Sequence, residues 1–117
     1  MLPPISAALS ALQAFGQKLG ITAGNIANLN TDGYKKSKAL LEEGRHGEVE
    51  VREQRSDTPG LPLDLPGSGA PAVRESSNVA LEEEIPALIT TVYGFKANLK
   101  AVKAQDELLG HLLNTVA

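Results

Sequence analysis

The C-terminal third of the chain, residues 81–116, carries a row of apolar residues that recur at alternating steps of four and three. This spacing places them along one side of a helix, over about five heptads. An isolated helix would expose the whole row to water, so the pattern predicts a helix that packs against another helix. The residues of this C-terminal seam are Leu81, Ile85, Leu88, Val92, Phe95, Leu99, Val102, Asp106, Leu109, Leu113 and Val116, of which only Asp106 is polar.

The N-terminal segment repeats the same spacing over about three heptads. Pro3 and Pro4 are compatible with the first turn of a helix, and we predict that this helix runs from Ile5 to Asn28. Because both ends of the chain carry a seam, we predict that two long helices pair as a coiled-coil-like hairpin. The residues of the N-terminal seam are Ile5, Leu9, Leu12, Gly16, Leu19, Ala23 and Ile26.

The remaining surface of the N-terminal helix carries little charge. Lys18 is the only charged residue before Asp32, and alanine occupies many positions where a solvated helix usually has charged side chains. Two interpretations stay open. The segment is either an alanine-rich helix of high propensity or a helix packed on several faces, as in an assembly of helices.

Residues 35–77, between the two predicted helices, have a different pattern. Glu48–Glu53 alternates polar and apolar residues, which predicts a strand; Gly44–Gly47 predicts a turn, and Ser37–Glu43 is the expected partner strand. Residues 58–71 are rich in proline and glycine, which predicts an extended linker. The expected fold is therefore one mainly α domain with three segments: helix and turn (1–34), β/loop segment (35–77) and C-terminal helix (78–117).

Composition argues against several classes of function. The chain has no cysteine, and His46 and His111 stand apart from other metal-ligating residues. No phosphate-binding glycine loop or nucleophile motif is present, and the net charge of −3 argues against nucleic acid. No segment approaches the roughly 20 apolar residues of a membrane span, and the N-terminus lacks the features of a cleavable signal. We therefore expect no enzyme, no cofactor, no metal and no membrane span.

The predicted N-terminal helix ends in an amide-rich turn. Asn25, Asn28 and Asn30 are followed by Asp32 and Gly33, residues that bond local backbone groups or accept left-handed dihedral angles. The run from Asn25 to Lys35, NIANLNTDGYK, closely resembles the N-terminal signature of the bacterial flagellar rod and hook proteins. The C-terminal segment, with SNVALEEEI from Ser77 and later LIT, ANLK and DELL, resembles the closing helix of the same family. The matching positions singled out here are Asn25, Asn28, Asn30, Thr31, Gly33, Tyr34, Asn78, Asn98 and Asp106.

The resemblance implies a structural subunit of the basal-body rod, a short member of the family that serves motility. It implies export by the flagellar type III apparatus and polymerisation in the periplasm with itself and with other flagellar axial subunits. The terminal helices would pack into a tubular wall, so their seams would be buried between subunits. The alternative is a free-standing helical-hairpin adaptor or secretion partner that uses the same two seams within a monomer or dimer.

Two local features concern the start of the C-terminal helix. Asn78 is predicted to cap it, which would place the three glutamates 82–84 near its positive end. Pro86 removes one backbone hydrogen bond and is predicted to bend the helix or mark a change of packing partner.

Three further features concern contacts along this helix. Asp106 either fixes the register of the seam or faces solvent. Asn98 is expected to reach the amides of Asn25 or Asn28 if the helices are antiparallel. Lys96, Lys100 and Lys103 share one face, which is either solvated or in contact with glutamates of another copy.

Overall fold

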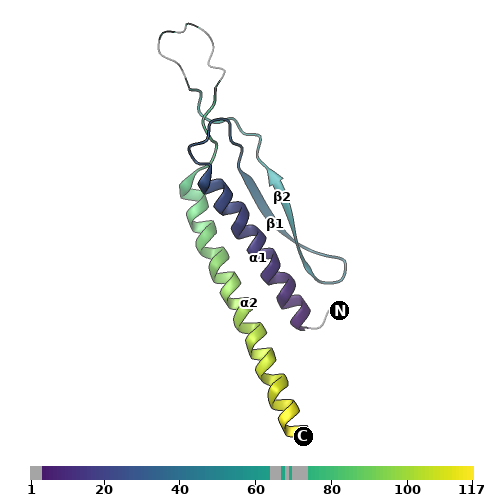
Figure 1. The fold of residues 1–117 in the computed structure, drawn as a ribbon. Coiled ribbons are helices and arrows are strands. Elements are labelled where there is room, and N and C mark those ends of the chain that lie inside the picture. The colour runs from purple at the N-terminus through teal and green to yellow at the C-terminus, as the bar shows by residue number, and fades with distance from the viewer. Residues whose placement is uncertain (1–3, 64–66, 68, 70–73) are drawn as a thin grey trace.

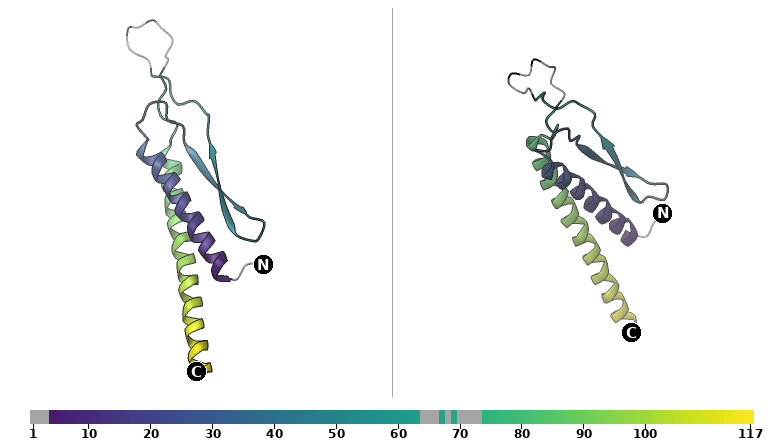
Figure 2. Two further views of the ribbon diagram at one scale, coloured as in Figure 1. Left: turned by 45° about the vertical axis from the view of Figure 1, so that its right-hand side comes forward. Right: turned by 45° about the horizontal axis from the view of Figure 1, so that its top comes forward.

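Two helices and a two-stranded hairpin make up the computed structural model, which describes residues 4–63, 67, 69 and 74–117. The elements follow in the order α1 (Pro4–Ala27), β1 (Ser37–Glu43), β2 (Val49–Arg55) and α2 (Leu81–Val116). The helices run antiparallel, and α1 lies between α2 and the hairpin (Figures 1 and 2). The prediction of a mainly α fold, in which paired helices flank a short β segment, is therefore confirmed.

The β-hairpin forms where the alternating pattern predicted it. Strands β1 and β2 pair antiparallel from Ser37 opposite Arg55 to Glu43 opposite Val49. In the turn, the Gly44 N–H donates to the Glu48 carbonyl over 2.7 Å, and Gly47 has a φ of 83°, which favours glycine. The hairpin is fastened to α1 as well, because the Val49 N–H donates to Ser10 Oγ over 3.1 Å.

In the connection from β2 to α2, two segments of the chain pair through backbone hydrogen bonds. The Leu63 N–H donates to the Arg74 carbonyl over 2.9 Å, and the Ser76 N–H donates to the Leu61 carbonyl over 2.8 Å. Gly60 lies so close to this pairing that a Cβ atom there would be 2.0 Å from the Ser76 carbonyl oxygen. Much of the predicted 58–71 linker lies outside the described residues, and its described start is extended and paired.

Helix α2 begins differently from the prediction. Its N-cap is Ala80, which makes no side-chain capping bond, and the Glu83 and Glu84 N–H groups both donate to the Ala80 carbonyl. Asn78 lies two residues earlier, so the prediction that it caps the helix was wrong. The helix continues through Pro86 to Val116 as one element. Pro86 is tolerated near the start, where it leaves only the Glu82 carbonyl without its helical donor.

The buried residues of the two helices are small or polar. The most buried residues of the helices are Ala8, Ala11, Ala14, Thr22, Asn25, Glu84 and Thr91. Gly94 lies against Phe15, since a Cβ atom at Gly94 would be 2.6 Å from the phenyl ring. Small residues allow the helix backbones to approach closely, so the larger side chains lie at the flanks of the contact.

This packing shifts the contact by one residue from the predicted seams. Ala8 is buried whereas the seam residue Leu9 is 46% exposed, and Glu84 is buried whereas Ile85 is 42% exposed. Within one chain, therefore, the residues of the two seams are at most half-buried. Several seam residues stay exposed, and others are half-buried: Leu12, Leu19, Ile26, Leu88, Val92, Phe95 and Val102.

Candidate assembly site

Asn25 joins the end of α1 to the start of β1. The residue is buried, with only 1% of its surface exposed. Asn25 Nδ2 donates to the Ser37 carbonyl over 2.8 Å, and its Oδ1 accepts the Ser37 N–H over 3.0 Å. The Tyr34 hydroxyl donates to the same Oδ1 over 3.3 Å. The amide thus pairs with both backbone groups of one strand residue, as a neighbouring strand would, and it fixes the angle between helix and hairpin.

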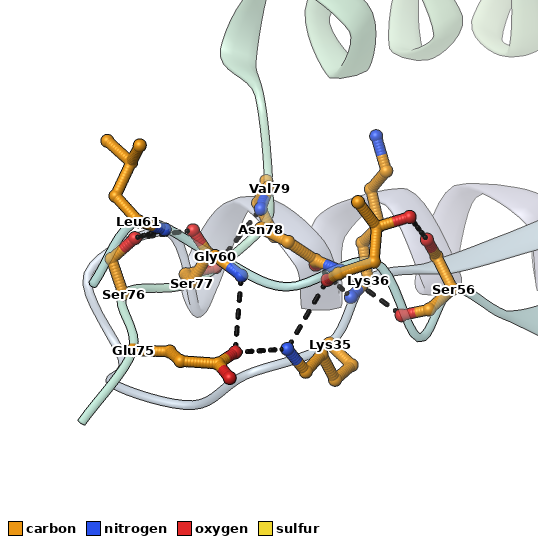
Figure 3. Close-up of polar contacts among 11 residues, drawn as sticks. Lys35, Lys36, Ser56, Gly60, Leu61, Glu75, Ser76, Ser77, Asn78 and Val79 are labelled. Carbon is orange, nitrogen blue, oxygen red and sulfur yellow. Dashed lines mark hydrogen bonds and ion pairs between the residues drawn. The ribbon is translucent and has the colours of Figure 1, made fainter. Parts of the chain in front are cut away.

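Asn78 performs a similar role at the entry to α2. Its Oδ1 accepts the Lys36 N–H over 2.6 Å, while Nδ2 donates to the carbonyls of Ser56 and Thr58 over 3.1 and 2.8 Å. The Asn78 N–H also donates to the Tyr34 carbonyl over 3.2 Å. Figure 3 shows Asn78 beside Lys36 and Ser56, where its own segment of the chain crosses theirs; we call this place the crossing point. Asn78 therefore ties the exits of α1 and β2 to the start of α2.

Ion pairs surround this crossing point. Lys35 Nζ lies 2.6 Å from Glu75 Oε2 and also donates to the Thr58 carbonyl, and the same carboxylate accepts the Gly60 N–H over 3.2 Å (Figure 3). The hydrogen bond from Lys35, followed by that from Gly60, lowers the pKa of Glu75 below its ordinary value of 4.5. Lys36 pairs with Glu83 and likewise lowers the pKa of that carboxyl.

The Lys35–Glu75 pair gives the crossing point a defined pH dependence. The depressed pKa means that the folded state holds the proton less tightly, so the stabilisation is complete above pH 4.5 and is lost as pH falls below it. We expect the urea midpoint of unfolding to fall in acid, and to fall less in Glu75→Gln. Glu53→Gln, at an exposed position, is the control and should keep the wild-type profile. An unchanged profile in Glu75→Gln would contradict this role.

The other family-motif residues occupy the turn after α1 or lie on α2. Asn28 Nδ2 bonds to the Gly24 carbonyl over 2.8 Å and its Oδ1 accepts the Thr31 hydroxyl, so both residues terminate α1. Gly33 has a φ of 71° and its N–H donates to the Glu75 carbonyl over 2.8 Å. Asn30 is exposed on this turn.

The expected contact from Asn98 to the amides of Asn25 or Asn28 is not formed. Asn98 Nδ2 donates to the Gly94 carbonyl of its own helix over 2.9 Å. The antiparallel register explains the error, because Phe15 lies opposite Gly94 and the end of α1 lies near the start of α2. Asp106 is exposed in this chain. Its predicted part in fixing a seam register is untested.

The end of α2 extends beyond its partner helix. Pro4 and Ile5 of α1 line an apolar pocket of about 230 Å³ together with Gln105, Leu108 and Leu109. Residues 110–117 are all exposed. Five large apolar residues here form what we term the C-terminal apolar end, and their exposed fractions run from 47% to 86%: Leu108, Leu109, Leu112, Leu113 and Val116.

The C-terminal apolar end continues the side of α2 that faces α1. Thr91, Asn98, Gln105 and Leu112 follow one another at heptad spacing, so they lie on one side of the helix. Thr91 is buried, Gln105 is half-buried and Leu112 is exposed, so the contact with α1 fades along this line. Exposed apolar clusters of this kind mark interaction surfaces in soluble proteins.

Sequence reasoning missed the contacts that hold the crossing point. Lys35 and Glu75 are 40 residues apart, and nothing local in the sequence signals their pairing.

Within the described residues, no group of three or more His, Cys, Asp or Glu side chains is placed to hold a metal ion. No helix in the described part of the chain is long and apolar enough to span a membrane.

Comparison with known proteins identifies both ends of the chain. Residues 5–35 match a family model described as Flagella basal body rod protein, and residues 72–115 match one described as Flagellar basal body rod FlgEFG protein C-terminal. Together the two matches cover more than half of the chain. The first spans most of α1 and the turn after it, and the second spans the approach to α2 and nearly all of that helix. No curated protein matches the chain.

Proposed function

This chain belongs to the flagellar basal body rod protein family, and we propose that it builds the rod by packing both of its helices against neighbouring axial subunits. It is a structural subunit of the basal-body rod, without enzymatic activity, and it serves motility. Membership of the family implies assembly with other axial subunits. That copies of this chain contact one another, and that the flagellar export apparatus delivers them, are parts of the proposal.

One observation carries the proposal: the subunit buries small residues and leaves large apolar residues at its surface. Only four apolar residues are buried among those described, namely Ala8, Ala11, Ala14 and Val79. Such a core removes little apolar area from water, so one subunit has little hydrophobic stabilisation of its own. Neighbouring subunits supply the missing contacts, first of all at the C-terminal apolar end.

In this proposal the predicted seams form contacts between subunits. Seam residues that are exposed in one chain, among them Leu9, Leu81, Leu99, Leu109 and Leu113, have exposed fractions between 39% and 71%. We assign them to contacts between subunits, while the small-residue row beside them joins the two helices of one subunit. A helix with both rows can pack against partners on two sides at once.

A cysteine-directed dye tests the proposal, because the natural chain has no cysteine. Val116→Cys, at an exposed position in the C-terminal apolar end, is labelled with an environment-sensitive fluorophore. We expect its emission to shift to the blue as protein concentration rises, since a neighbouring subunit covers the site. Arg45→Cys in the exposed hairpin turn is the control. No blue shift at Val116→Cys, with the protein monodisperse, would favour a free-standing helical hairpin.

A further inference from the structure

Helix α2 has one side free of α1 (Figure 1), and a second line of exposed residues runs along it. They recur at steps of three and four, and so share one face of the helix. We call this line the outer stripe; it runs through Glu82, Ile85, Ile89, Tyr93, Lys96 and Lys100. Ile85, Ile89 and Tyr93 are 42%, 51% and 68% exposed.

Charge is divided along the outer stripe. Its start is acidic: Glu82 is exposed and forms no ion pair within the described residues. Its middle is basic: Lys96, Lys100 and the following Lys103 are exposed, and they too have no ion pair in the part of the chain that the structure describes. Glu82 and Lys100 are 18 residues apart, which is five helical turns or about 27 Å. One face of one helix thus carries two complementary patches.

The basic patch also offers a place for an apolar side chain. A shallow depression of about 400 Å³ is lined by Tyr93, Lys96, Ala97, Leu99 and Lys100. Its lining is mostly carbon, and it includes two lysines whose stems can cover apolar surface while the ammonium groups remain free. Such a depression suits an apolar side chain with a carboxylate one turn away.

The chain itself carries a matching group at the start of α2. Ile85 lies three residues after Glu82, so a large apolar side chain and an exposed carboxylate are neighbours on the outer stripe. Glu107 is a poorer match because it lies four residues after Lys103 on the same helix, next to the basic patch. Glu42 is already paired with Arg52.

We propose that the acidic start of the outer stripe in one copy docks on the basic depression of a second copy, displaced by about 27 Å along the helix. This contact rests on the proposed function, because it requires copies of the chain to meet within the rod. It is head-to-tail, so each copy offers one free acidic start and one free basic depression to the next. Contacts of that kind extend an assembly in one direction, whereas a two-fold pairing of the same patches would close after two copies.

Charge reversal tests this contact. Glu82→Lys alone, and the double variant Lys96→Glu/Lys100→Glu alone, should each raise the concentration for half-assembly about tenfold, because like charges then face each other. An equal mixture of these two variants restores opposite charges at every contact and should assemble like the wild type. The triple variant should do so by itself. Arg45→Glu, in the exposed hairpin turn, is the matched control and should have no effect.

Sedimentation velocity separates the possible outcomes. If the contact is head-to-tail, the mixture forms species much larger than dimers. If assembly of the mixture stops at dimers, the patches pair in a closed two-fold arrangement and the head-to-tail contact is wrong. Circular dichroism checks that each variant, when dilute, has the same helicity as the dilute wild type. If the wild type assembles and both charge variants assemble equally well, this contact is wrong and the proposed function stands. If the wild type does not assemble at any concentration, the proposal that copies of this chain contact one another is wrong, and this contact is wrong with it.

Discussion

Replacing Asn25 with leucine is expected to lower the free energy of unfolding by about 3 kcal/mol. The two side chains are similar in size, so the substitution leaves little cavity. It removes the side-chain groups that bond to the Ser37 N–H and carbonyl, and the hydroxyl of Tyr34 loses its acceptor. Each buried polar group left without a partner costs about 1–3 kcal/mol.

Urea unfolding followed by circular dichroism measures this effect. Wild type and variant are compared at one protein concentration, because the stability of an assembling protein depends on concentration. Asn28→Leu is the matched control: Asn28 lies three residues later, and its side chain bonds to Gly24 and Thr31. Its loss should cost about 1 kcal/mol or less. Equal losses in the two variants would show that Asn25 only terminates the helix.

The second large effect is expected on assembly. The double variant Leu109→Lys/Leu113→Lys should raise the concentration for half-assembly at least a hundredfold, while the dilute variant keeps the helicity of the dilute wild type. In a single chain these positions are 47% and 71% exposed, so substitution there changes stability by only about 0.5 kcal/mol. In the assembly, a lysine placed in an apolar contact must lose water without gaining a partner, which costs several kcal/mol.

Sedimentation of wild type and variant over a range of concentrations measures this loss. Lysine is a good helix former and is favoured near a helix C-terminus, so the variant does not disturb α2 itself. Asn114→Lys introduces the same charge at the adjacent exposed position and should assemble normally. If the double variant assembled as well as Asn114→Lys, the C-terminal apolar end would not be a subunit contact.

Much of the fold could be predicted because its signals are local. The period of the apolar residues predicted both helices, alternation at Glu48–Glu53 predicted the strand β2, and glycines marked the turn before it. The line of contact between the helices could not be predicted from the same pattern. Large apolar residues give the strongest periodic signal, and here they lie beside a row of Ala, Thr and Gly that forms the closer contact.

The sequence motif identified which residues belong to the site. It did not reveal the roles that some of them have in the structure. Asn78 has the sequence context of a helix cap, and only the chain crossing shows that Lys36, Ser56 and Thr58 use its amide instead. Asn98 was placed correctly on α2 but without knowledge of the register. Such roles depend on which distant segments meet, and a single sequence contains no local record of that.

Circular dichroism on purified protein, at micromolar and then near-millimolar concentration, tests the central claim most directly when sedimentation velocity is run on the same samples. The 24 residues of α1 and the 36 of α2 make up about half of the chain. A subunit that depends on its neighbours should show helicity well below one half when dilute, and the helicity should rise as large species form. Full helicity in a monodisperse monomer or dimer at both concentrations would contradict the account.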